Sequence, residues 1–401
     1  MPCIVDVNSD RPRRRASRTG AHVVALALVG VSLIVAGCGG SDETGGTASE
    51  EQAKPASAGP LAQADADAKT HTAQITSFSQ WSPGPSPKPK TNQTLGSVTC
   101  LWSVPACKRL ADGVKAAAEA IGWEAKVVDG TPDPNNQRQA LQTLLQQKVD
   151  ALVMVSLDEN NIGDLLKQAE RAKIPWIGIN MLRPEEFGAI DNVDVTGKLK
   201  SGQEGGRELA AWVASKSKGK AKVLMMSSTD NPGLQQRDKG FQDYLKDFPD
   251  IKFVSKTIYV PFRDLGAPLE AQVQSLMQRY PPGSIDYIYT PFDGFATSVV
   301  NGLQAAGRTD VKVLGFDGSP QNLEFIRGGR SQAASQATAW KWCAFTAVDE
   351  LNRALSGESI PKKGCPGKVV DETNAPPKGQ VFDGDLDVEA EFKKLWQGSG
   401  Q

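Results

Sequence analysis

Short apolar runs and amphipathic segments alternate along most of this chain, from about residue 94 to residue 319. Residues 95–102, 123–128 and 151–155 read as strands, and the last is a continuous apolar run typical of a strand buried on both faces. Between the first two, apolar residues recur at helical spacing over 110–121, which puts them on one buried face. Further elements are expected in the same alternation: helices over 135–147, 161–172, 202–214, 237–248, 269–280 and 295–306, and strands over 174–179, 221–226, 253–259, 285–289 and 311–315.

This alternation predicts the fold class. Strands joined by helices of this length pair in parallel through right-handed crossovers. The roughly 270 residues from 94 to about 365 are enough for two lobes, each with its own core. We therefore expect an α/β protein of two doubly wound parallel-sheet lobes joined by a hinge. The N-terminal lobe is expected over 94–192 plus 337–365, and the C-terminal lobe over 193–336.

The first 37 residues have the features of an export signal. Five arginines lie between Arg11 and Arg18, and residues 23–36 form an apolar run too short for a comfortable membrane span. The run ends in Val-Ala-Gly followed by Cys38, which resembles the lipobox of bacterial lipoproteins, where the cysteine thiol accepts diacylglycerol. Residues 1–37 are therefore predicted to be a lipoprotein signal peptide, with Cys38 as the lipidated N-terminus. An ordinary signal with a chance cysteine is the alternative.

Two terminal segments differ in composition from the alternating region. Residues 38–93 hold few large apolar side chains and cannot bury enough surface to offset their ordering entropy, so they are predicted to be a flexible tether. Phe78 and Trp81 are exceptions that could dock on the folded body. Residues 366–401 are predicted to be a C-terminal tail, in which Phe392 and Trp396 stand at the spacing of a short docking helix.

Four cysteines fall within the expected folded region: Cys100, Cys107, Cys343 and Cys365. In an exported protein two disulfides are the simplest outcome. Proximity favours pairing Cys100 with Cys107 and Cys343 with Cys365, although four cysteines allow three pairings. A reactive or metal-binding cysteine is the weaker alternative, because the sequence has no CxxC motif and no nearby histidine.

Composition excludes several functional classes. Without the signal the chain has 40 basic and 44 acidic residues, a net charge of −4, which argues against nucleic acid or a membrane surface as partner. His22 leaves with the signal and His71 lies in the predicted tether, so the folded body is expected to hold no histidine. That excludes histidine-dependent triads and histidine-ligated zinc. Carboxylate-only catalysis stays open as an alternative, but no paired-acid motif stands out. Neither GxGxxG nor GxxxxGK[ST] occurs, so dinucleotide and phosphate-loop sites lose support, and we predict no cofactor, no metal and no enzymatic activity.

The position of a ligand site follows from the expected sheets. Ligands of parallel α/β sheets bind outside the carboxyl ends of the strands, where loops and helix N-termini supply free amides. This rule selects the loops 100–107, 156–160, 180–181, 227–237, 260–264, 291–295 and 316–319.

Several stretches of the chain match one protein family in the family's order: residues 110–113 (LADG), 120–123 (AIGW), 127–129 (VVD), 173–175 (KIP), 237–241 (RDKGF), 302–307 (GLQAAG) and 315–320 (GFDGSP). From about Thr94 to Thr338 the chain resembles the ribose/galactose-type periplasmic binding proteins of sugar ABC transporters, which have the type I fold. The resemblance implies two lobes, joined by three crossings, that close on a small polar ligand and then dock on a membrane permease.

The same resemblance implies ligand roles for three residues at strand ends. Arg237 would donate hydrogen bonds to ligand hydroxyl or ring oxygens, Asp317 would accept from neighbouring hydroxyls, and Phe262 would cover an apolar sugar face. The alternatives are an exposed helix start for Arg237, a helix cap for Asp317 and lobe core for Phe262. Asp293, at a position where the family usually keeps an acid, is the next polar candidate.

Other positions depart from the ribose pattern toward less polar residues, and each unmatched buried hydroxyl costs about 1–3 kcal/mol, so ribose itself is disfavoured. An aromatic pair is replaced by Ala106-Cys107, an Asp-Arg pair by Asn180-Met181, an Asn by Phe292, and a Gln by Ala337, with Gln336 adjacent. Asn180, Phe292, Trp102 and Gln336 complete the candidate ligand set. Trp102, Phe292 and Trp340 would stack on the ligand if they turn inward and would belong to the lobe or hinge core if they do not.

Together these features predict a monomeric substrate-binding lipoprotein of an ABC importer, anchored outside the cytoplasm by its N-terminal lipid. The expected partners are a sugar or polyol-like small molecule and an ABC permease. A binding protein that presents its ligand to a membrane receptor or kinase has the same sequence features and is the alternative. A lipoprotein hydrolase is disfavoured because the expected folded body lacks histidine.

Overall fold

A computed structural model describes residues 59–131, 133–195 and 202–398. Cys38 and the predicted signal peptide lie outside these ranges. Among the helices within them, none has the length and apolar character needed to cross a membrane.

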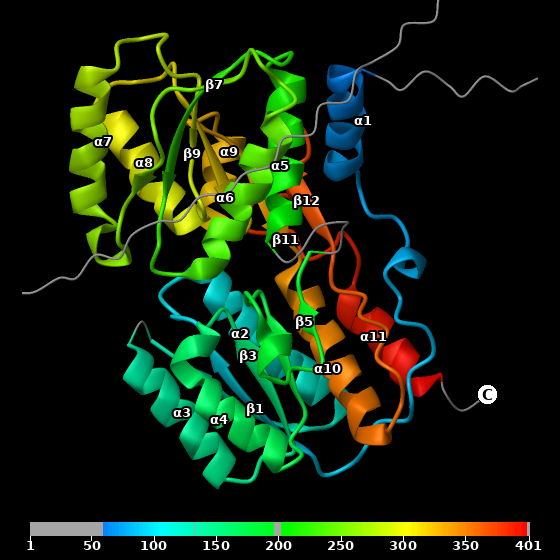
Figure 1. Ribbon diagram of the computed structural model, residues 1–401. Helices are drawn as coiled ribbons and strands as arrows, with labels where there is room; N and C mark the ends of the chain where they lie inside the picture. Colours follow the sequence, from blue (N-terminus) through cyan, green and yellow to red (C-terminus); the bar gives the residue numbers. More distant parts are fainter. Residues whose placement is uncertain (1–58, 132, 196–201, 399–401) are drawn as a thin grey trace, which may run out of the picture. The chain divides into compact units, whose positions relative to one another are not determined.

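A five-stranded, wholly parallel sheet organises the first lobe, in the order β2-β1-β3-β4-β5. Helices α2 and α10 pack on one face of it, and α3 and α4 pack on the other (Figure 1). The strands are β1 (Thr94–Thr99), β2 (Glu124–Asp129), β3 (Ala151–Val155), β4 (Trp176–Ile179) and β5 (Asn192–Val193). The helices are α2 (Pro105–Ile121), α3 (Pro134–Gln146), α4 (Glu159–Arg171), η2 (Pro184–Phe187) and α10 (Trp340–Ser356).

A seven-stranded sheet organises the second lobe, in the order β12-β11-β10-β9-β6-β7, with β8 paired to β6. All its pairings are parallel except β11 with β12. Helices α5 and α6 pack on one face, and α7 and α8 on the other. The strands are β6 (Lys222–Ser227), β7 (Lys252–Phe253), β8 (Ile258–Tyr259), β9 (Tyr287–Tyr289), β10 (Lys312–Phe316), β11 (Gln332–Thr338) and β12 (Gly367–Val370). The helices are α5 (Gln203–Lys216), α6 (Pro232–Leu245), η3 (Phe262–Asp264), α7 (Ala267–Arg279), α8 (Asp293–Ala305) and α9 (Pro320–Arg327).

This architecture confirms the predicted fold class of two doubly wound α/β lobes. One expected strand differs, because residues 253–259 form two short strands instead of one. β7 pairs with the start of β6 and β8 pairs with its end, and residues 254–256 between them form a bend.

The predicted flexible tether is wrong for residues 59–93. This part of the chain forms α1 (Pro60–Thr72) and the short helix η1 (Phe78–Gln80), and both are packed on the lobes. The small side chains that suggested disorder are what permit close docking: Ala64 and Ala68 are buried where α1 meets α5. Phe78 and Trp81 do pack against the first-lobe core, as the sequence suggested.

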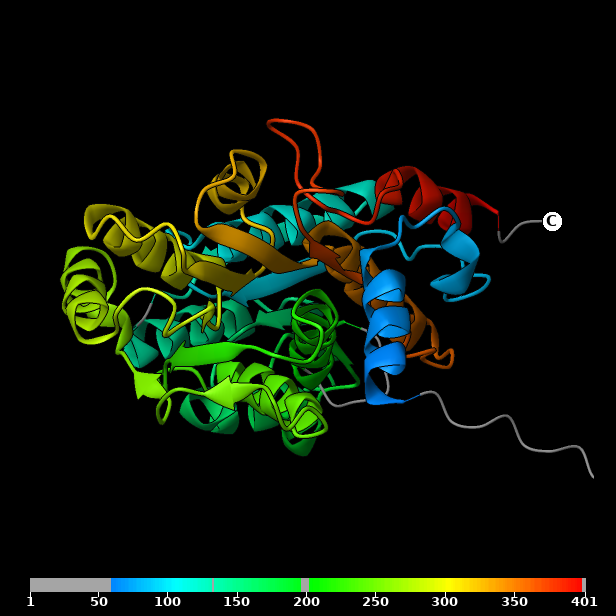
Figure 2. The ribbon, with the colours of Figure 1, turned by 90° about the horizontal axis from the view of Figure 1, so that it is seen from above.

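The C-terminal segment is also part of the folded body and not a tail. Residues 367–370 add the antiparallel strand β12 to the second sheet, and α11 (Val388–Gln397) packs on the first lobe. Phe392 and Trp396 are buried there against Phe345 of α10. In Figure 2, α11 and the segment that follows α1 lie side by side.

Both expected disulfides are present. Cys100 pairs with Cys107 across the loop from β1 to α2, and Cys343 of α10 pairs with Cys365, just before β12. The second bridge therefore fixes the chain where it leaves the first lobe for the second sheet.

The expectation of a folded body without histidine is wrong as well. His71 lies in the last turn of α1 and its Nδ1 is 3.3 Å from the Oε1 of Glu208 on α5. The Nη2 of Arg207 lies 3.4 Å from the other ring nitrogen. His71 was misplaced because its segment was assigned to the tether.

Candidate functional site

An ion pair between Arg237 and Asp317 lies at the carboxyl ends of the second-sheet strands. Arg237 is on the second turn of α6, and its Nη2 is 3.0 Å from Oδ1 of Asp317, which follows β10. The Nη1 donates to the carbonyl of Pro291 at 2.8 Å, and the guanidinium covers the ring of Phe316. Both ionic side chains are about 6 % exposed, so their charges are compensated within the protein.

Three strand-end residues adopt a left-handed backbone that favours glycine. Ser156 after β3 has φ 50°, Asn180 after β4 has φ 51°, and Asp317 has φ 93°. Such conformations cost of order 1–3 kcal/mol each and concentrate at functional sites. Their shared position therefore marks the edge of the two sheets that the strand-end rule selected.

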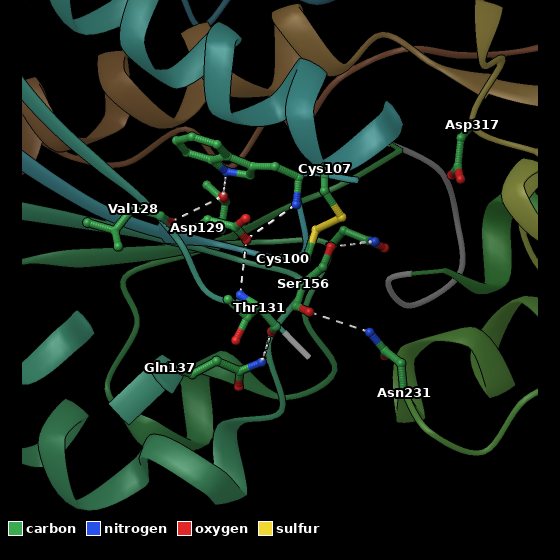
Figure 3. The surroundings of a disulfide bond; sticks show 12 residues. Cys100, Cys107, Val128, Asp129, Thr131, Gln137, Ser156, Asn231 and Asp317 are labelled. Carbon is green, nitrogen blue, oxygen red and sulfur yellow. Dashed lines mark hydrogen bonds between the residues drawn. A yellow bond between two sulfur atoms is a disulfide. The ribbon is translucent and has the colours of Figure 1, made fainter. Parts of the chain in front are cut away.

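Hydrogen bonds join the two lobes at this edge (Figure 3). The Nδ2 of Asn231, which caps α6 of the second lobe, donates to the carbonyl of Ser156 in the first lobe at 3.4 Å. The Oγ of Ser156 in turn accepts from Nδ2 of Asn180 at 2.9 Å. The predicted residue Asn180 is thus placed at the boundary between the lobes, where it bonds the residue that contacts the opposing lobe.

Arg109 makes a second connection between the lobes. It is on α2, and its Nη1 donates to the carbonyls of Asp317 and Gly318 at 3.2 Å each. Its Nη2 bonds the Phe382 carbonyl and the Asp383 carboxylate, both at 2.9 Å. The first lobe therefore holds the Asp317 loop through its backbone and leaves the Asp317 side chain to Arg237.

The disulfide loop lies on the first-lobe side of the same edge. Trp102 is held within it by two hydrogen bonds, from Nε1 to the Thr99 hydroxyl at 2.6 Å and from its amide to Asp129 at 3.3 Å. Figure 3 shows the Cys100–Cys107 bridge between the Asp129 side and the side where Ser156 and Asn231 lie. The indole is partly exposed, with Lys108 over its ring.

The predicted aromatic residues of the second lobe form a cluster beside this edge. The rings of Phe262 and Phe292 meet edge to face at 5.6 Å, and Phe292 also contacts Phe295 in the lobe core. The amide of Phe262 donates to Asp230 at 2.6 Å, which fixes the loop. Phe262 is half-buried whereas Phe292 is buried, so Phe262 has the free surface and Phe292 supports it.

The side chain of Asp293 is committed to the inside of the second lobe. It is fully buried, and its carboxyl bonds with the Ser319 amide, the Gln332 amide group and the Ser335 hydroxyl at 2.7–3.1 Å. Burial first, and then the charge of Asp317, raise the pKa of Asp293 to about 8, so it is protonated at neutral pH. Asp293 therefore joins α8, β11 and the Asp317 loop. These bonds do not favour the predicted direct contact between Asp293 and a ligand.

Gln336 and Trp340 are also directed elsewhere. Gln336 is buried and donates from Nε2 to Oε2 of Glu208 on α5 at 2.9 Å. Trp340 begins α10 and is buried in the first-lobe core, so the core alternative for this residue holds. Both residues flank the passage from β11 to α10, and their packing fixes that crossing.

Sequence reasoning named the loops of this site but missed some of its residues. Arg109 gave no signal, because an arginine near the start of a helix is ordinary at the surface. Asn231 followed by Pro232 is a recognisable helix start, an N-cap followed by proline at N1, and could have been found. A surface hollow of about 700 Å³ lies elsewhere, next to η1 and α11, and none of the predicted site residues lines it.

Two parallel α/β lobes with a buried Arg–Asp pair and interlobe hydrogen bonds at their strand ends define a class: two-lobed binding proteins with the type I fold. The family model of the periplasmic binding protein domain matches residues 103–359, and the chain belongs to this family. This confirms the resemblance found in the sequence. The family consists of solute-binding proteins and not of enzymes, and it functions outside the cytoplasm.

Several curated relatives and solved structures are similar to this chain. A D-apiose import binding protein from Actinobacillus succinogenes is 24 % identical over 71 % of this chain and 90 % of its own length. The ribose import binding protein RbsB of Salmonella typhimurium is 25 % identical over 67 % and 87 %, respectively. A solute-binding protein from Agrobacterium vitis with bound allitol superimposes with a TM-score of 0.64 at 23 % identity, over 72 % of this chain and 98 % of that one. This last likeness establishes the fold.

Proposed function

We propose that this protein is the substrate-binding lipoprotein of an ABC importer and that it binds a neutral sugar or polyol between its lobes. The main observation that supports this proposal is the Arg237–Asp317 pair at the edge where both lobes meet. Arg237 offers N–H donors and Asp317 offers carboxylate acceptors, which together match the hydroxyl groups of a polyol. The names of the relatives, which refer to D-apiose, ribose and allitol, support the same ligand class.

The charge of the site supports an uncharged ligand. Arg237 and Asp317 neutralise one another, and with its pKa raised to about 8 Asp293 adds no full charge at neutral pH, so these three side chains supply no net charge to match an ionic ligand. Phe262 supplies an apolar surface suited to the C–H face of a sugar. Binding is proposed to stabilise the closed arrangement because the ligand would contact Arg237 and Asp317 of one lobe and the Ser156–Asn180 edge of the other.

The decisive test is ligand capture followed by substitution at the pair. Mass spectrometry of small molecules released from the purified mature chain, and a thermal-shift screen with D-apiose, D-ribose, allitol and xylitol, should identify a neutral polyhydroxy compound. Arg237→Ala should then raise Kd for that compound roughly 100-fold, because two charge-assisted hydrogen bonds are lost. Arg138→Ala, at an exposed Arg138–Asp164 pair on the first lobe, is the matched control and should leave Kd unchanged. Release of a charged compound, or equal Kd for both variants, would refute the assignment.

The anchoring is a separate proposal that the sequence around Cys38 supports. We infer that a monomer is held to the membrane by lipid on Cys38, so that the binding lobes remain close to an ABC permease. A single lipidated cysteine bearing several acyl chains is enough for stable attachment. Cys38→Ala should abolish incorporation of labelled palmitate and release the protein from the membrane fraction; membrane retention of the variant would contradict the proposal.

A further inference from the structure

Helix α1 is attached to the second lobe. Ala64 has no exposed surface and belongs to the core cluster formed by α5 and α6. Asp67 accepts from Nη1 of Arg207 at 2.8 Å and from the hydroxyl of Tyr244 at 3.0 Å. Asp65 bonds the hydroxyl of Ser215 at 2.6 Å, so both ends of the contact with α5 are fixed.

The chain that follows α1 is attached to the first lobe. The ring of Phe78 lies 5.2 Å from that of Trp342 on α10 and 5.3 Å from that of Phe392 on α11. Ser86 is buried and donates to Oδ1 of Asp349, also on α10, at 2.5 Å. The carbonyls of Gly84 and Pro87 accept from Arg353 and Asn352 of the same helix.

Five residues, 73–77, separate these two attachments, and they are themselves bonded. The amide of Ile75 donates to Oδ2 of Asp385 at 3.0 Å, and the same oxygen is 2.8 Å from Nζ of Lys368 on β12. The carbonyl of Thr72, at the end of α1, accepts from Asn374 at 3.0 Å. Five residues span at most about 18 Å when fully extended, so the connection can lengthen only a little.

We propose that residues 60–90, here called the strap, restrain the opening of the two lobes. A hinge motion changes the distance or angle between α5 and α10. The strap is packed on both helices and has a bonded connection between them, so it must lose one attachment for a wide opening. The family match covers residues 103–359 and leaves the strap and α11 outside it. The restraint is therefore an addition to the two-lobed fold.

The thermodynamic consequence is a smaller open population before ligand arrives. When only a fraction of the molecules has the conformation that can bind ligand, the apparent affinity is reduced by that fraction. A restraint that excludes wide-open states removes part of this loss. The inference concerns the protein without ligand and does not depend on the ligand class proposed above.

The test measures the distance between the lobes in the ligand-free mature chain. Spin labels on Gln139→Cys in α3 and Gln272→Cys in α7, with Cys38→Ser to remove the lipidated thiol, report the separation on the side away from α1 (Figure 1). Ala64→Glu/Ala68→Glu places two charges in the buried face of α1 and should release it from α5. Ala62→Glu/Ala66→Glu adds the same charges to exposed positions of the same helix and is the matched control.

Release of α1 should shift the interlobe distance distribution to longer values and broaden it, and the control should match the parent chain. Loss of amide protection over 61–72 verifies that α1 has left its site. A second variant that begins at residue 73 lacks α1 entirely and should show the same shift. Unchanged distances in that truncated variant, with both lobes still folded by circular dichroism, would overturn the proposal.

Discussion

Glu350 is a buried carboxyl that faces a second carboxyl, Asp191, and has no exposed surface on α10. Burial first, and then the charge and hydrogen bond of Asp191, raise the pKa of Glu350 to about 9. At neutral pH the pair therefore holds a proton that an exposed glutamate, whose ordinary pKa is 4.5, would have released. The pair sits where α10 meets the start of β5, inside the first lobe.

The pH dependence of stability follows from this proton. Because the folded state binds a proton that the unfolded state loses above its own pKa, the free energy of unfolding should fall as pH rises between about 4.5 and 9. The slope for this one group is about 1.4 kcal/mol per pH unit. Glu350→Gln should flatten the decline measured by urea denaturation at several pH values, and the exposed Glu358→Gln should not. Equal slopes in parent and Glu350→Gln would contradict the assignment.

Asp349 shows how one residue can hold three elements together. Its carboxylate accepts from Ser86 of the strap, from Nε1 of Trp396 on α11 at 2.9 Å, and from Nε of Arg353 on its own helix at 2.8 Å. Asp349→Ala should lower the free energy of unfolding by about 3–5 kcal/mol, since it leaves a buried guanidinium without its partner. Asp112→Ala, which breaks an exposed pair on α2, should change it by less than about 1 kcal/mol. Chemical denaturation measures both, and similar losses would argue against this account of Asp349.

At the scale of elements, the sequence predicted the helices and strands that have a clear hydrophobic periodicity. The buried apolar run of β3 and the apolar face of α2 are local patterns, and both elements form where expected. α1 was missed because its alanines and aspartates carry almost no helical periodicity. Its helix is stabilised by contacts with α5 that lie some 140 residues away in the chain, such as Asp67–Arg207. β12 was missed because four residues beyond a proline and a glycine give no strand signal of their own.

For the candidate site, the sequence predicted the position of the residues along the sheet edge but not the direction of their side chains. Arg237 and Asp317 were expected at one edge of the second sheet, and the structure brings them together there after β6 and β10, because the carboxyl ends of parallel strands share an edge even when contacts are unknown. The direction of a side chain is set by its neighbours, which explains why Gln336 faces Glu208 and why Asp293 faces Ser335. Neither orientation can be predicted from the residues that neighbour Gln336 or Asp293 in the sequence.

At the scale of the whole described body, the chain passes between the lobes more often than the three crossings the family resemblance implies. Besides the connections from β5 to α5, from β11 to α10 and from α10 to β12, it crosses from α1 to η1 and from β12 to α11. The two additional crossings meet at Asp385, which contacts Ile75 and Lys368. Both terminal segments therefore belong to the hinge region of this protein.

The contact of α1 with the second lobe should depend on pH through His71. Burial by itself lowers the pKa of His71, but the hydrogen bond and charge of Glu208, assisted by Glu204 and opposed by Arg207, raise it above 6.5 overall. Protonated His71 therefore stabilises docking fully below pH 6.5, and this contribution is lost as pH rises through the raised folded pKa. Hydrogen exchange of amides 61–72, corrected for intrinsic rates, should show protection that declines as pH rises through this raised pKa.

His71→Gln should remove that decline, because a glutamine keeps a hydrogen bond to Glu208 without titrating. The amides of α11, which contains no histidine, serve as the internal control in the same experiment and should show the same pH dependence in His71→Gln as in the parent chain. The ring nitrogen of His71 and the carboxylates of Glu204 and Glu208 also lie close enough to hold a divalent cation, so the measurement is made with and without a chelator. Protection of α1 that is independent of pH in both conditions would show that Asp67, and not His71, governs the attachment of the strap to the second lobe.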